Sequence, residues 1–257
     1  MGDPEVLAIT ELTKRFGRLE AVSGLSLAVR PGDIYAFLGP NGAGKTTTIR
    51  CIAGLLLPES GEIRVNGHSV HPDALEFRRV LGYVADRPFL YEKLTAWEFL
   101  EFLAGVHALR GWEAEAERFL TLFKLIEWRH QLVEGYSHGM RQKLVLTGAL
   151  LHKPKLLLVD EPMVGLDPRS SRDVRDLFRE LAAGGMGLFL STHSLDLASE
   201  LATRIGILHH GRLVAEGSFD ELRDVARQPG SSLEEVFLRL TEEEDEPPRP
   251  GTAQERP

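Results

Sequence analysis

Residues 39–47 read Gly39-Pro40-Asn41-Gly42-Ala43-Gly44-Lys45-Thr46-Thr47. This stretch fits the pattern G-x-x-x-x-G-K-[ST], which is typical of a loop that binds phosphate groups. The apolar run from Asp33 to Leu38 predicts a buried strand before it, and residues 46–57 predict a helix after it. That order, strand then loop then helix, is the context in which the motif works. We therefore expect the fold to be organised around this loop.

Each residue type in the loop has a physical role in holding phosphate. Glycines at positions 39, 42 and 44 allow positive φ angles, which turn backbone N–H groups toward a ligand. The start of the following helix adds the positive end of its dipole. Lys45 supplies a charge for the β- and γ-phosphates, and the hydroxyl of Thr46 can ligate Mg²⁺. The sequence thus predicts a nucleoside-triphosphate site.

Composition limits the class of protein. A chain of 257 residues with 43% hydrophobic residues can form one large α/β domain or two small ones. Cys51 is the only cysteine, which excludes an intrachain disulfide and a cysteine-based zinc site. No run approaches 18 apolar residues, so no membrane span is expected.

The net charge of −8 argues against nucleic acid as a partner, because nucleic-acid binders are usually basic. Residues 241–257 hold six acidic residues against two arginines. This acidic, proline-rich composition predicts a disordered tail.

Apolar strands alternate with helices along most of the chain, which predicts a mostly parallel sheet. Strands are expected at residues 6–12, 25–29, 33–38, 61–67, 80–84, 155–160, 187–191, 204–208 and 212–215. Helices are expected at residues 46–57, 72–79, 95–109, 112–125, 139–151, 168–183, 195–201, 219–226 and 233–240. Residues 95–150 carry almost no strand pattern, so they predict a helical subdomain inserted into an α/β body. Thr95 and Glu98 form a capping-box pattern at its start.

Polar residues follow two further apolar strands. The run from Leu156 to Asp160 ends in Glu161, and ligands bind at the carboxyl edge of such sheets. Asp160 can hold Mg²⁺ through water, and Glu161 can act as general base on an attacking water. The alternative is that Asp160 and Glu161 only cap a helix. His193 follows the other strand and could contact a γ-phosphate.

The motifs together resemble those of the nucleotide-binding subunit of an ABC transporter, over roughly residues 5–240. The quoted motifs occur in the family's order: Phe16 for the aromatic that stacks on adenine, residues 39–47 for the phosphate loop, residues 82–86 for the Gln-loop, residues 136–140 for the signature, residues 156–161 for the second nucleotide motif, residues 165–167 for the D-loop, and His193 for the switch histidine.

The resemblance implies a P-loop NTPase core with a mostly parallel sheet, an antiparallel β subdomain and a helical subdomain inserted at residues 95–150, with residues 241–257 as a tail. It implies ATP and Mg²⁺ as cofactors and an ATPase activity. Two copies would sandwich two ATP molecules, with Ser137 and Gly139 of one copy reaching the γ-phosphate held by the other. A separate membrane permease would be the second partner, with this chain on the inner face of the membrane, as in bacterial exporters.

Several positions depart from the family pattern. His138 and Met140 replace a glycine and a glutamine of the signature, and we favour a role for His138 in filling space rather than in donating a hydrogen bond. Asp86 replaces the glutamine of the Gln-loop. Its carboxylate can hold a metal-bound water but cannot donate an amide hydrogen bond. Val164 stands where the D-loop often has a polar residue. The resemblance implies that residues 87–94, which include aromatics, form the surface on which the permease docks; the alternative is that these aromatics pack locally.

Two other functions remain open at this point. A soluble ABC ATPase acting on DNA or ribosomes predicts paired cassettes, coiled-coil insertions or basic patches, and the sequence has none of these. A GTPase would need an Asn-Lys-x-Asp motif, which is absent. A small-molecule kinase would have no need for residues 136–140 or for His193.

Overall fold

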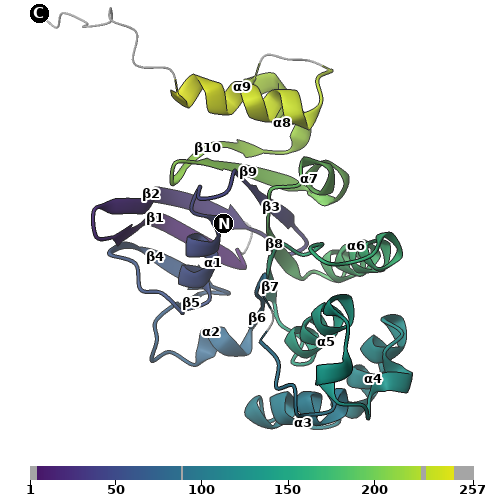
Figure 1. Cartoon of the computed structure of the whole chain (residues 1–257). Helices are drawn as coiled ribbons and strands as arrows, with labels where there is room; N and C mark the ends of the chain where they lie inside the picture. Colours follow the sequence, from purple (N-terminus) through teal and green to yellow (C-terminus); the bar gives the residue numbers. More distant parts are fainter. Residues whose placement is uncertain (1–4, 88, 227–229, 246–257) are drawn as a thin grey trace, which may run out of the picture.

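The computed structural model describes residues 5–87, 89–226 and 230–245. Within these residues the strands form two sheets, one of six strands in the order β10-β9-β3-β8-β7-β6 and one of four in the order β2-β1-β4-β5 (Figure 1). The strands are β1 (Leu7–Phe16), β2 (Leu19–Val29), β3 (Ile34–Leu38), β4 (Ser60–Val65), β5 (His68–Ser69), β6 (Leu81–Val84), β7 (Leu156–Asp160), β8 (Gly187–Thr192), β9 (Arg204–His209) and β10 (Arg212–Gly217).

Helices lie against the larger sheet and beyond both of its ends (Figure 1). They are α1 (Lys45–Ile52), α2 (Glu76–Arg79), α3 (Ala96–Val106), α4 (Glu113–Leu122), α5 (His138–Leu150), α6 (Pro168–Ala183), α7 (Leu195–Leu201), α8 (Phe219–Val225) and α9 (Leu233–Asp245). In the described part of the chain, no helix has the length and apolar character needed to cross a membrane.

The larger sheet is mostly parallel, as the sequence predicts. β3 pairs in parallel with β8 and β9, and β7 pairs in parallel with β6 and β8. Only β10 runs antiparallel to its neighbour β9. Every residue of β3, β7 and β8 is buried, which explains their continuous apolar sequences, because both faces of a parallel sheet are covered. The smaller sheet is antiparallel throughout, so the α/β fold class is confirmed.

Alternate residues of the central strands serve two different cores. Tyr35, Phe37 and Phe189 face α1 and the smaller sheet, and the Phe189 ring centroid lies 5.4 Å from that of Tyr35 and 5.1 Å from that of Phe37. Leu188 and Leu190 face the opposite core, which includes residues of α6. Burying one side chain of this kind stabilises the folded state by about 1.5–3 kcal/mol. The sheet is therefore fixed from both sides.

The helical subdomain lies at one end of the larger sheet (Figure 1). Thr95 caps α3, because its hydroxyl accepts a hydrogen bond from the Glu98 amide at 3.2 Å, while the Glu98 carboxylate accepts one from the Thr95 amide at 2.8 Å. This is the capping box predicted from the sequence. α4 and α5 complete the subdomain, whose apolar residues join the core beneath α6.

Some element boundaries differ from the predicted ones. α1 ends at Ile52 rather than near Leu57, because Gly54 has a φ of +68° that stops the helix. At the other end of the chain, α9 continues past Leu240 to Asp245. Residues 246–257 of the predicted tail lie outside the described residues.

The single thiol is buried on α1. Cys51 has no exposed surface, and burial raises its pKa to about 11 because the charged thiolate is poorly solvated there. Cys51 thus packs into the core from the helix that follows the phosphate loop.

Two histidines stack where α3 and α5 meet β6. The ring centroids of His107 and His152 are 4.2 Å apart, and the two ring planes are nearly parallel. Nε2 of His152 lies 3.0 Å from the carbonyl oxygen of Leu81, so it carries the proton in the neutral ring, while Nδ1 is buried without a partner. Burial, followed by the neighbouring His107, lowers the pKa of His152 to about 4.

We expect this histidine to make the fold sensitive to mild acid. Between about pH 6.5 and pH 4 the unfolded chain binds the proton and the folded chain does not, so the free energy of unfolding falls as the pH is lowered through this window. His152→Gln should flatten that part of the profile relative to the parent chain. Urea unfolding at a series of pH values would measure the difference. Profiles of equal slope in the two proteins would show that folding does not lower the pKa of His152.

Candidate functional site

A cavity of about 550 Å³ opens between the phosphate loop, the β1–β2 hairpin and the carboxyl ends of the central strands. It contains four of the functional groups predicted from the sequence, namely the Lys45 amine, the Thr46 hydroxyl and the Asp160 and Glu161 carboxylates. Its lining comprises Phe16, Leu19, Glu20, Ala21, Asn41, Gly42, Gly44, Lys45, Thr46, Thr47, Asp86, Asp160, Glu161, His210 and Gly211. Residues of the phosphate loop and the two carboxylates therefore line the same cavity.

Close backbone packing shapes the phosphate loop. Gly42 and Gly44 have φ angles of +83° and +110°, and a Cβ at Gly44 would overlap the carbonyl oxygen of Ala21. A Cβ at Gly39 would overlap the carbonyl oxygen of Leu208 in the same way. Only glycine, which has no Cβ, lets the loop backbone come this close to the two carbonyl oxygens. The loop is therefore held against both β2 and β9.

Lys45 is buried in the middle of the loop, with 7% of its surface exposed. Its Nζ donates hydrogen bonds to the carbonyl oxygens of Gly39 at 2.7 Å and Pro40 at 3.1 Å. Burial lowers the pKa of Lys45, and the nearby Glu161 and Asp160 carboxylates partly offset that effect. The amine therefore lines the cavity next to two carboxylates, which favour its charged form.

Asp160 is buried at the end of β7 with one carboxylate oxygen free. Its Oδ1 accepts a hydrogen bond from the Ser191 hydroxyl of β8, and its Oδ2 is buried without a protein partner. A buried carboxylate oxygen without a partner is costly, and a cation or a metal-bound water would satisfy it. Thr46 lines the same cavity with its hydroxyl. These two oxygen donors fit Mg²⁺, which is commonly held by few protein ligands together with phosphates and water.

Glu161 and His193 form a hydrogen-bonded pair beside Asp160. Nδ1 of His193 lies 2.8 Å from Oε1 of Glu161, and the Thr192 hydroxyl donates to Oε2 at 3.4 Å. Glu161 has a φ of +51°, a conformation that is uncommon for a residue with a side chain and is often found at functional sites. The structure thus brings the predicted base and the predicted switch histidine together, and His193 reaches the cavity through Glu161.

The cavity also contains Phe16, which the sequence predicts, and five residues of two other segments, which it does not. Phe16 is half exposed there, as expected for a ring that could stack on a base, and Lys14 Nζ lies 5.4 Å from its ring centroid. Leu19, Glu20 and Ala21 of β2 also line the cavity, as do His210 and Gly211 from the turn between β9 and β10. No motif marks these residues, because the fold brings them to the loop from two other segments.

Ser137 and Gly139 do not line the cavity of their own chain, and the resemblance assigns them to the ATP held by a second copy. Ser137 caps α5 by accepting a hydrogen bond from the Met140 amide at 3.3 Å. The His138 ring packs on Gly165, where a Cβ would overlap it. The ring therefore fills the space above a glycine, which supports the space-filling role expected for His138.

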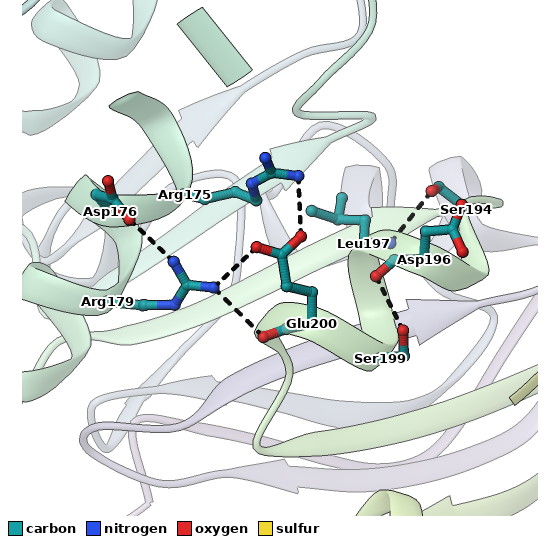
Figure 2. Close-up of polar contacts among 8 residues, drawn as sticks. All are labelled: Arg175, Asp176, Arg179, Ser194, Asp196, Leu197, Ser199 and Glu200. Atoms are coloured by element: carbon teal, nitrogen blue, oxygen red, sulfur yellow. Dashed lines mark hydrogen bonds and ion pairs between the residues drawn. The ribbon is translucent and has the colours of Figure 1, made fainter. Parts of the chain in front are cut away.

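The segments after Glu161 and after His193 are tied together by ion pairs. Figure 2 shows Glu200 of α7 between Arg175 and Arg179 of α6, with Nη1 of Arg175 3.0 Å and Nη2 of Arg179 3.1 Å from its carboxylate oxygens. α6 begins directly after Asp167, and α7 begins directly after Ser194, which caps it. The helices that follow the D-loop and the switch histidine are therefore linked.

Asp167 caps α6 and has an altered acidity. Its Oδ1 accepts hydrogen bonds from the amides of Arg169 at 3.0 Å and Ser170 at 3.1 Å. Hydrogen bonding, first from the Ser170 side chain, lowers the pKa of Asp167 to about 2. The D-loop carboxylate is thus engaged in starting the helix.

Comparison with known proteins gives a consistent result. A family model described as "ABC transporter" matches residues 22–164. The daunorubicin resistance ATP-binding protein DrrA3 of Streptomyces coeruleorubidus is 40% identical over 228 residues, which cover 88% of this chain and 71% of that protein. The probable multidrug ABC transporter ATP-binding protein YbhF of Escherichia coli is 35% identical over 93% of this chain, which spans only 42% of that longer protein.

A solved structure of the ATP-binding subunit of an ABC transporter is 34% identical and superimposes with a TM-score of 0.88, covering 92% of this chain and 99% of that one. The ordered motifs, the shared cavity and these matches agree. The chain belongs to the ABC transporter family.

Proposed function

We propose that this chain binds and hydrolyses ATP as the subunit that powers a separate membrane permease. The observation that carries the proposal is the arrangement of Lys45, Asp160 and the Glu161–His193 pair around one cavity. The relatives named above are described as ATP-binding proteins of drug-resistance and multidrug systems, which is consistent with an exporter. A subunit that powers a membrane permease would lie on the inner face of the cell membrane.

Each group has a separate task in hydrolysis. The loop amides and Lys45 hold the phosphates, and Asp160 and Thr46 would hold Mg²⁺, which would supply positive charge against the phosphates. Glu161 takes the proton from the attacking water as general base. The hydrogen bond from His193 fixes the direction of the Glu161 carboxylate. Asp86 lines the same cavity and is assigned to a metal-bound water.

A second copy of the chain would complete each site. Ser137 and Gly139 lie at the start of α5, a helix whose first amides are suited to phosphate but do not line the cavity of their own chain. If two copies pair about a two-fold axis, the α5 start of each can close the cavity of the other. ATP would then favour the closed dimer, and hydrolysis would reopen it.

An exposed apolar surface near the helical subdomain is assigned to the permease. Phe89 is 83% exposed, and its ring packs edge-on against Tyr91, which packs in turn against Phe102 of α3. Val106, one turn further along α3, borders a groove of about 500 Å³. We call residues 89–94 the docking loop. An amphipathic cytoplasmic helix of the permease fits this surface.

Replacing Lys45 with alanine should abolish ATP binding. The substitution removes the cation at the centre of the loop and leaves the phosphates without their strongest partner. Titration with a fluorescent ATP analogue would measure the affinity. Lys155→Ala, an exposed lysine that does not line the cavity, is the matched control and should bind as the parent does. Near-normal affinity in Lys45→Ala would remove the loop from the proposed site.

Replacing Glu161 with glutamine should preserve ATP binding and reduce hydrolysis by about 10²–10⁴-fold, which is the usual contribution of a general base. ATP should then trap a dimer that elutes early in size-exclusion chromatography. Glu117→Gln, on the exposed side of α4, is the control and should turn over normally. If Glu161→Gln hydrolysed ATP at the parental rate, another group would be the base.

Replacing Asp86 with asparagine should change the response to the permease more than it changes ATP binding. Lys45 and Thr46 remain in place, so affinity should stay within a few-fold. Asp86 lies between the end of β6 at Val84 and the docking loop, so stimulation of ATPase activity by the permease should fall further than the basal rate. ATPase assays in lipid, with and without the permease, make the comparison. An equal fold-loss in both conditions would assign Asp86 to the active site alone.

A further inference from the structure

Two segments distant in sequence lie side by side just before α5. Thr95 and Leu132 form an antiparallel bridge. The Val133 amide donates to the carbonyl oxygen of Leu94 at 2.9 Å, and the Glu134 amide donates to that of Glu92 at 3.0 Å. The docking loop is therefore hydrogen-bonded to the residues that lead directly into Ser137.

Arg141 connects these two segments to the first turn of α5. Its Nε donates to the carbonyl oxygen of Tyr136 at 3.1 Å, and its Nη2 donates to that of Glu134 at 3.1 Å. Its Nη1 donates to Oε1 of Glu92 on the docking loop at 2.6 Å. One rigid guanidinium thus holds the signature segment and the docking loop at once through three separate nitrogens, whereas a lysine would offer a single nitrogen.

Helix stability does not explain an arginine at this position. A cation in the first turn is unfavourable because the helix dipole is positive there, and the first turn of α5 has no acidic residue to compensate. The Arg141–Glu92 pair is also partly exposed, and such pairs add little to stability. The Arg141–Glu92 contact therefore adds little free energy to the fold. Its effect is to fix the position of the docking loop relative to the signature segment.

We propose that Arg141 is a positioning residue that couples the docking loop to the signature segment, so that displacement of Glu92 by a docked partner moves the first turn of α5. This inference rests on the proposed function, because it takes residues 89–94 as the surface on which the permease docks. It assigns to Glu92 and Arg141 the step that links docking to the part of the chain expected to meet the ATP of a second copy.

The test uses the isolated full-length chain and amide hydrogen exchange. Within α5, the Met140 amide bonds to the Ser137 hydroxyl and the Arg141 amide bonds to the Ser137 carbonyl. Glu92→Gln removes the charge that holds Arg141, and it should speed exchange at these two amides by about two- to fivefold, the range expected for loss of an exposed ion pair. Arg141→Gln should do the same, and the double variant should show no further increase.

Lys93→Gln is the matched control. Lys93 neighbours Glu92 and pairs with Glu134 at 2.5 Å, but it does not contact Arg141, so its loss should leave the two amides unchanged. Glu92→Asp, which keeps the charge, should restore much of the protection. Unchanged exchange in Glu92→Gln, or an equal change in Lys93→Gln, would overturn the proposal.

The thermal midpoint of unfolding separates positioning from general stabilisation. We expect it to stay the same in Glu92→Gln. A lowered midpoint with faster exchange throughout the helical subdomain would overturn the positioning role. None of these measurements uses the permease or ATP, so a failure of the transport function in its own assays would be distinguishable from a failure here.

Discussion

The parallel register of β3, β7 and β8 is the constraint on which the rest of the molecule depends. Leu38 pairs with Thr192, and Asp160 pairs with Ser191, so the three strands end at the same edge. The phosphate loop, Glu161 and His193 each follow one of these ends. A slip of one residue would turn every side chain to the opposite face, and the two cores that enclose the sheet oppose that slip. The geometry of the candidate site is thus set by apolar packing.

The sequence predicts those features that depend on local pattern. The buried strands, the phosphate loop and the capping box at Thr95 each have a signature within a few residues. The end of α1 was predicted too late, because the effect of Gly54 depends on a positive φ that the composition alone does not reveal. Glu20 and His210 carry no signature, since they reach the cavity only through the packing of β2 and the β9–β10 turn against the loop.

Contacts around the site differ in character from those in the cores. The cores are apolar and closely packed, whereas the links between functional segments are partly exposed ion pairs, such as Glu200 with Arg179 and Glu92 with Arg141. Pairs of this kind contribute little free energy, so they can rearrange without threatening the fold. The contact of His138 with Gly165 adds a steric link between the signature and the D-loop. The apolar cores thus hold the sheet in place, while the ion pairs between the functional segments are weak enough to be exchanged.

The burial of Cys51 has a practical consequence for measuring such rearrangements. A thiol reacts with maleimides and similar reagents as its thiolate, and Cys51 is both inaccessible and held in the neutral form. It is also the only cysteine in the chain. A cysteine introduced at a chosen surface position would therefore be the sole reactive group, so fluorophores or spin labels can be attached site by site without first replacing a native residue.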